Sequence, residues 1–143
     1  MQSLYQELIM DHNRHPRHFE VLEPCDCKAV GHNHLCGDKW VIYVRMEGDT
    51  IGEVSFVGEG CAISKASASL MTEIARGMSL PEFEALYHEF HRILTSQDDI
   101  PEQLGKLRAL TGVREYPARV KCATLAWHTL SQALRGQLES QTE

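Results

Sequence analysis

Three cysteines that lie far apart in the chain have side chains suited to act together on a metal ion or on sulfur. Cys36 is followed by Gly37-Asp38, Cys61 lies at the expected start of a helix, and Cys122 lies in the first turns of the expected last helix. Each cysteine falls where one element gives way to the next, so a fold could gather all three with Asp38. Three thiolates and a carboxylate are ligands for a tetrahedral metal ion, and thiolates also carry sulfur chemistry.

The residues around these cysteines favour the charged form of the thiols. Gly37 can adopt backbone angles that turn both of its neighbours toward one centre, and a helix start stabilises a thiolate at Cys61. Three thiolates and a carboxylate carry about four negative charges, of which a zinc ion offsets two. Arg119, one helical turn before Cys122, is the candidate that offsets the remaining charge, and Lys121 is a weaker one.

Composition limits the classes of function. The chain has 143 residues, 43% hydrophobic residues and a net charge of −6, which fits one compact domain over residues 1–143. The acidic balance argues against a nucleic-acid partner, and no stretch is apolar enough to suggest a membrane span. The first residues lack the basic start of a secretory signal, so the five cysteines are expected to be reduced thiols in the cytoplasm.

Hydrophobic periodicity predicts an α+β fold. Strands are expected at 40–46 and 50–57, joined by a turn at 48–49, with a weaker strand at 29–32. Helices are expected at 3–13, from 61 to 76, at 81–94, at 101–110, and from 117 onward. The order predicts a small antiparallel sheet of about three strands with helices packed on one face.

Other residues with chemical potential have simpler interpretations. Cys25 and Cys27 flank one aspartate, and this spacing fits no standard zinc knuckle, so we interpret the pair as an incidental loop feature. Five histidines in the first part of the chain are expected to be solvated loop residues, because their spacing is not that of metal ligands: His12, His15, His18, His32 and His34. Of these, His34 is kept as a weak candidate for a residue that supports the metal ligands.

Three motifs together resemble a known family. The segments Asn33-His34-Leu35-Cys36-Gly37-Asp38, Gly58-Glu59-Gly60-Cys61-Ala62-Ile63-Ser64 and Ala118-Arg119-Val120-Lys121-Cys122-Ala123 are similar to the cysteine motifs of the IscU/NifU-like iron–sulfur cluster assembly proteins. The similarity covers nearly the whole chain and is closer to the SufU type. Scaffold-type members have histidine where this chain has Lys121, and residues 77–110 resemble the helical insertion of the SufU type. The chain departs from the family at His34, where proline is usual.

The resemblance implies a zinc-bound sulfurtransferase in iron–sulfur cluster biogenesis. By this resemblance, zinc is held by Cys36, Asp38, Cys61 and Cys122. Cys36 is the sulfur acceptor, which is released from the metal when a SufS-type cysteine desulfurase docks. The sulfur is then passed to downstream iron–sulfur scaffold proteins.

Two alternatives remain at the level of sequence. In the first, the same ligands assemble a transient iron–sulfur cluster on the protein, and Asp38 makes that cluster labile. In the second, zinc only stabilises a binding module. Structural zinc sites usually have cysteine and histidine ligands, so a carboxylate ligand favours a reactive site over this second alternative.

Overall fold

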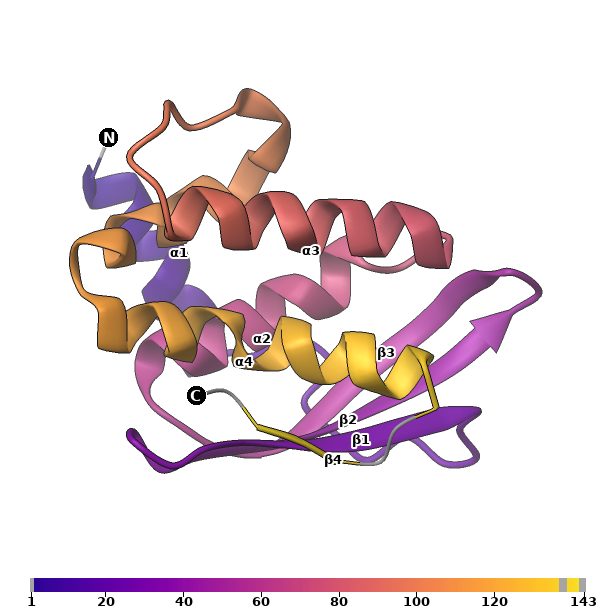
Figure 1. Cartoon of the computed structure of the whole chain (residues 1–143). Coiled ribbons are helices and arrows are strands. Elements are labelled where there is room, and N and C mark those ends of the chain that lie inside the picture. Colours follow the sequence, from indigo (N-terminus) through magenta and orange to yellow (C-terminus); the bar gives the residue numbers. More distant parts are fainter. Residues whose placement is uncertain (1, 137–138, 142–143) are drawn as a thin grey trace.

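The computed structural model describes residues 2–136 and 139–141, and it places all of the helices on one face of a single sheet (Figure 1). The strands are β1 (Cys27–Asn33), β2 (Asp38–Glu47), β3 (Thr50–Glu59) and β4 (Glu139–Gln141). The helices are α1 (Gln2–Arg14), α2 (Ala62–Ile74), α3 (Leu80–Leu94), the 3₁₀ segment η1 (Glu102–Glu115) and α4 (Pro117–Leu134). The predicted α+β class, with helices packed on one face of the sheet, is confirmed.

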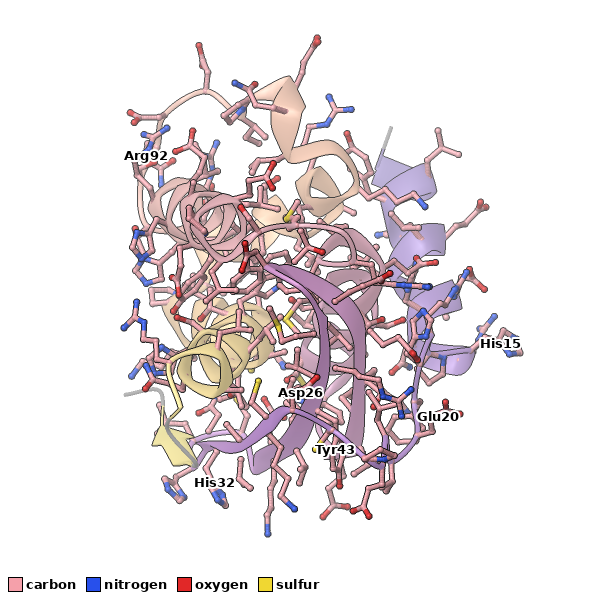
Figure 2. All side chains as sticks on the ribbon, turned by 90° about the vertical axis from the view of Figure 1, so that its right-hand side faces the viewer. His15, Glu20, Asp26, His32, Tyr43 and Arg92 are labelled. Atoms are coloured by element: carbon pink, nitrogen blue, oxygen red, sulfur yellow. The ribbon has the colours of Figure 1, made fainter. Side chains whose placement is uncertain are left out.

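The sheet has the strand order β3-β2-β1-β4. The first three strands pair antiparallel, as the sequence predicts, whereas β4 adds a short parallel partner to β1 at Val30–Glu139. The opposite face of the sheet carries no helix among the described residues, and the side chains of His32 and Tyr43 lie on that face (Figure 2).

Alternation along β2 explains how the sheet joins the helices. Trp40, Ile42 and Val44 are fully buried on the helical face, as expected of apolar side chains at every second position of a half-covered strand. The ring of Phe56 on β3 packs edge-to-face against Trp40, with centroids 5.2 Å apart. This apolar layer fixes the register of β2, and with it the place of Asp38 at the first position of the strand.

Helix α4 lies close to the sheet because β1 has a glycine beneath it. A Cβ atom at Gly31 would lie 1.9 Å from Oγ1 of Thr129 and 3.2 Å from Cδ1 of Leu125. On its other side α4 contacts α3 through Trp127, whose ring stacks on Phe83 with centroids 5.5 Å apart. The helix that carries Cys122 is therefore held between the sheet and α3.

Local sequence signals explain where α3 begins, but they do not predict the 3₁₀ conformation of η1. Ser79 and Glu82 form a reciprocal capping box at the start of α3, which satisfies two backbone donors at the helix end. The predicted short helix at 101–110 is instead a 3₁₀ segment that continues to Glu115. Its backbone leaves the helical region at Gly105, with φ 55° and ψ −127°. Because glycine adopts such angles without a steric penalty, the segment bends there rather than forming one regular helix.

The interpretation of His12 as a solvated loop residue is wrong. This histidine lies in the last turn of α1 and is only 1% exposed. Its Nδ1 atom lies 2.7 Å from Oγ of Ser69 on α2, and its Nε2 atom lies 3.8 Å from a carboxylate oxygen of Glu73. His12 follows Leu8 by four residues, so it falls on the same face of α1 that packs against the core.

Within the described residues, no helix has the length and apolar content needed to cross a membrane.

Substitution of Gly31 by alanine tests the close approach of α4 to β1. The added methyl group would displace Thr129, so we expect Gly31→Ala to lower the free energy of unfolding by about 1–3 kcal/mol. Gly112→Ala is the matched control, because a Cβ atom there meets no atom within 4 Å, and its effect should stay below about 1 kcal/mol. Urea denaturation followed by circular dichroism measures both. Equal midpoints for Gly31→Ala and the parent chain would contradict the packing described.

Candidate metal and sulfur site

The site lies at one end of the sheet, where the β1–β2 turn, the β3–α2 junction and the start of α4 meet. Ligand atoms of Cys36, Asp38 and Cys122 all lie within 4.8 Å of one another. Cys61 adjoins this group through a hydrogen bond between its sulfur and the thiol of Cys122. The structure thus brings the ligand atoms of Cys36, Asp38 and Cys122 together, whereas Cys61 lies beside this group and is not part of it.

Cys36 lies on a tight turn whose backbone bonds are collected by one residue. The carbonyl oxygen of Asn33 accepts hydrogen bonds from the amides of Cys36 at 3.3 Å and Gly37 at 2.9 Å. The Asn33 side-chain oxygen accepts a third bond from the amide of Leu35 at 3.2 Å. Gly37 has φ +73°, a backbone conformation that residues with a Cβ atom rarely adopt. The turn leaves Cys36 exposed to solvent.

Asp38 is buried and only partly satisfied. One carboxylate oxygen, Oδ1, accepts a hydrogen bond from the amide of Cys61 at 2.8 Å. The other, Oδ2, is buried and has no hydrogen-bond partner among the described residues. Gly60 makes the arrangement possible, because a Cβ atom there would lie 2.9 Å from Oδ1 and 2.6 Å from the Trp40 ring. A buried carboxylate oxygen without a donor is costly unless a cation binds it.

The pKa values of Cys61 and Cys122 are shifted in opposite directions. Cys61 is the N-cap of α2, and its sulfur accepts a hydrogen bond from the amide of Ser64 at 3.4 Å. The hydrogen bond from Cys122, helped by the Ser64 amide, lowers the pKa of Cys61 to about 6 despite its burial. Cys122 is fully buried, and its pKa is raised, first by the same hydrogen bond to Cys61 and then by burial.

The sulfur atoms are crowded and lie beside one cation. The sulfurs of Cys36 and Cys122 are 3.0 Å apart, well beyond the ~2.05 Å of a disulfide bond. Cys122 has one thiol proton for two sulfur neighbours, so any further ionisation places negative charges side by side. Arg119 responds to this charge, since its pKa is raised first by Cys61 and then by Cys122.

This donor set fits a thiophilic divalent cation. Three sulfurs and an unpartnered carboxylate oxygen match the number and type of ligands that zinc takes in proteins. A bound cation would also satisfy Oδ2 of Asp38 and allow the proton on Cys122 to leave.

Comparison with known proteins places the chain in a family. The sequence profile of the NifU-like N-terminal domain matches residues 4–137. The chain belongs to this family, whose members take part in iron–sulfur cluster assembly.

Individual relatives of this NifU-like protein carry two different descriptions. It is 37% identical over 136 residues to the zinc-dependent sulfurtransferase SufU of Bacillus subtilis, covering 94% of this chain and 91% of that protein. It is also 34% identical to the iron–sulfur cluster assembly scaffold protein IscU of Streptococcus pyogenes, covering 99% and 89% of the two. A solved structure from Fervidobacterium islandicum, described as a SUF-system scaffold protein, superposes with a TM-score of 0.85 at 34% identity over 93% of this chain and 98% of that one.

Sequence reasoning missed Asn33 as part of the site of this NifU-like protein. The residue is fully buried, and its Nδ2 atom lies 3.7 Å from the sulfur of Cys122, 89 residues away. It thus supports the Cys36 turn and contacts the most buried thiol at once. An asparagine three residues before a cysteine at a predicted turn is a weak local signal, because asparagine often bonds its own backbone in turns.

Two other candidates lie apart from the site. Cys27 begins β1 and Asn33 ends it, a separation of six residues or about 20 Å along a strand. Cys25 and Cys27 are free and half-buried, and neither belongs to the group of candidate ligands among the described residues. Lys121 lines a cavity between α3 and α4.

The pKa of Cys61 predicts selective alkylation of the metal-free protein. A pKa lowered to about 6 makes Cys61 mostly thiolate at pH 7 and protonated below pH 6, so its reaction with iodoacetamide should rise with pH around that value. Cys27 is the internal comparison, because burial raises its pKa, and it should react only at higher pH. Peptide mass spectrometry across pH 5–9 measures both rates. Equal pH profiles for the two cysteines would show that the Cys122 bond does not stabilise the Cys61 thiolate.

Two substitutions at Asn33 separate its functions. Asn33→Ala removes the acceptor for the amide of Leu35 and should increase hydrogen exchange at that amide roughly fivefold, the effect of losing about 1 kcal/mol. Asn33→Asp retains an oxygen at the same place, so exchange at Leu35 should remain close to that of the parent chain. Both variants lack the Nδ2 donor, so both should lose the contact with the sulfur of Cys122. Rapid exchange in Asn33→Asp as well would refute the role assigned to the side-chain oxygen.

Proposed function

We propose that this protein is a zinc-dependent sulfurtransferase of iron–sulfur cluster biogenesis that accepts sulfur on Cys36. The observation that carries the proposal is the unequal exposure of the thiols. Cys36 is exposed on a glycine turn, whereas Cys122 is fully buried and Cys61 caps a helix. A partner can therefore reach Cys36 while the other residues of the site stay in place.

Cys36, Asp38, Cys61 and Cys122 are the proposed zinc ligands. The ion would keep the thiols deprotonated at neutral pH and lower their nucleophilicity until it is needed. The proposal is supported by the unpartnered Oδ2 atom of Asp38 and by the relative described as a zinc-dependent sulfurtransferase.

The proposed donor is the cysteine persulfide of a SufS-type cysteine desulfurase in the cytoplasm. The Cys36 thiolate attacks the outer sulfur of that persulfide and forms a new sulfur–sulfur bond. The bond between the outer sulfur and the desulfurase cysteine breaks, and that cysteine leaves as a thiolate. One sulfur atom moves, and no external oxidant or reductant is consumed. The persulfide on Cys36 is then passed to downstream iron–sulfur scaffold proteins by the same exchange.

Arg119 is proposed to stabilise negative charge during this exchange. Its side chain responds most strongly to Cys61 and Cys122, so it lies within the field of the thiolates that stay behind when Cys36 reacts. A guanidinium keeps its positive charge at every physiological pH, which suits it to a site whose thiolate count changes during the reaction.

A second candidate function is a scaffold on which an iron–sulfur cluster is assembled and transferred. The observation that favours it is the 34% identity to a relative described as an IscU scaffold protein, since the same four residues could hold iron. The two functions differ in the metal of the purified protein. Zinc at about one ion per chain supports the sulfurtransferase, whereas iron with acid-labile sulfide supports the scaffold.

The test of the sulfurtransferase is persulfide formation on Cys36. Zinc-loaded protein is incubated with a SufS-type desulfurase and L-cysteine, and peptide mass spectrometry locates the added sulfur atom. We expect the persulfide on Cys36, its loss in Cys36→Ala, and no change in Cys25→Ala, a matched control outside the site.

The rate of cysteine turnover by the desulfurase gives a second readout. Cys36→Ala should abolish the stimulation of that rate, because the desulfurase persulfide then has no acceptor. If no persulfide forms on Cys36, and Cys36→Ala stimulates the desulfurase as well as the parent chain does, the proposal is wrong.

A further inference from the structure

A cavity separate from the cysteine site lies between the C-terminal half of α3, the turn that follows it, the end of η1 and the part of α4 from Pro117 to His128. Its volume is about 670 Å³, which is within the range of small-molecule binding sites. The cavity is lined by residues from two separate stretches of the chain, 87–97 and 114–128, including Leu94, Arg114 and Val120. None of the four proposed zinc ligands lines it.

The charged residues that line this cavity are all basic, although the protein as a whole carries a net charge of −6. Arg114 and Lys121 are half-buried in its wall, and no described carboxylate forms an ion pair with either one. Arg114 is held instead by neutral groups, donating from Nη1 to the carbonyl oxygen of Asp98 at 2.8 Å. Because half-buried cations without a counter-charge are unfavourable, the cavity favours an anion.

Two histidines add hydrogen-bonding groups to this wall. His91 and His128 both line the cavity, and Nδ1 of His128 lies 3.1 Å from the hydroxyl of Tyr87. Burial raises the pKa of Tyr87 to about 12, so the hydroxyl keeps its proton and can donate it to Nδ1. In the tautomer that accepts this bond, His128 carries its own proton on Nε2, which gives the ring a donor for a ligand.

The remaining wall is partly apolar and partly made of uncharged polar side chains, those of Thr95, Ser96, Gln97 and Thr124. Leu94, Pro117 and Val120 line the cavity beside the basic residues, so an occupant meets positive charge at one part of its surface and hydrocarbon at another. An inorganic anion alone would leave the apolar part in contact with water.

We propose that this cavity binds a small organic anion, a carboxylate or a phosphate ester attached to an apolar group. Lys121 and Arg114 would hold the charged group, and Leu94 and Val120 would cover the apolar one. The site is independent of the sulfur acceptor, because it lies on the α3 side of α4 and uses none of the cysteines.

The test uses the full-length, zinc-loaded protein and four probes in isothermal titration calorimetry. Phenylacetate and phenyl phosphate represent the two anion classes, and phenylacetamide and benzyl alcohol are neutral compounds of similar size. We expect saturable binding of at least one anion at one site per chain. The stronger anion identifies the class of ligand. The neutral compounds should bind at least roughly tenfold more weakly, the loss of one charge-assisted hydrogen bond.

Two lysine substitutions locate the binding. Lys121→Met keeps an unbranched side chain, one heavy atom shorter, and removes its charge, so it should weaken anion binding by roughly tenfold. Lys106→Met makes the same change at an exposed lysine that does not line the cavity, and its effect should stay within about twofold.

Three results would overturn the proposal. Neither anion saturates the protein, the neutral compounds bind as tightly as the anions, or Lys106→Met weakens binding as much as Lys121→Met. None of these results bears on persulfide formation at Cys36, so the two proposals stand or fall separately.

Discussion

The hydrogen bond from the Cys61 amide to Asp38 is the constraint on which the site depends. It joins the first residue of β2 to the N-cap of α2. It uses one carboxylate oxygen, while the other stays buried with no hydrogen-bond partner in the described part of the chain. Gly60 allows the two segments to approach, since any side chain there would enter the space of Asp38 and Trp40. The apolar packing of the sheet against the helices therefore fixes the position of the Asp38 carboxylate but supplies no hydrogen bond to its Oδ2 atom.

Charge is the second organising feature. The cluster offers more negative charge than its immediate protein surroundings neutralise. The pKa of Cys61 is lowered and that of Cys122 is raised, so the contact between them favours a proton on Cys122 and a thiolate at Cys61. Arg119 supplies positive charge from the exposed side of α4. A protein arranged in this way is poised for a divalent ion, because the ion removes the conflict among the thiols and satisfies the carboxylate together.

The sequence predicted the elements whose signals are local. Apolar runs at 40–46 and 50–57 predicted β2 and β3, and Ser79 with Pro81 marked the start of α3. β4 was not predicted, because three polar residues pair with β1 only through contacts far along the chain. His12 was misread for a similar reason, since only the packing of α1 on α2 shows that it is buried.

The same division holds for the site. Cys36, Cys61 and Cys122 were proposed as a set because each falls at a junction between elements and because their motifs resemble those of a family. The structure places Cys36 and Cys122 close to Asp38, with Cys61 beside them. Asn33 was missed because its contact with Cys122 spans 89 residues, and no spacing in the sequence reveals such a contact. The cavity beside Lys121 was likewise hidden, because it forms only when α3, η1 and α4 pack together.

Solvent exposure decreases from Cys36 to Cys122, so the site has one side open to solvent and one side buried in the protein. A reagent that approaches from solvent meets the turn before it meets either helix, and the backbone amides of that turn are held by hydrogen bonds to Asn33. The buried side is formed by α2 and α4, whose packing in the hydrophobic core holds Cys61 and Cys122 in place. The turn that carries Cys36 can therefore change its conformation without disturbing the packing of α2 and α4 that stabilises the fold.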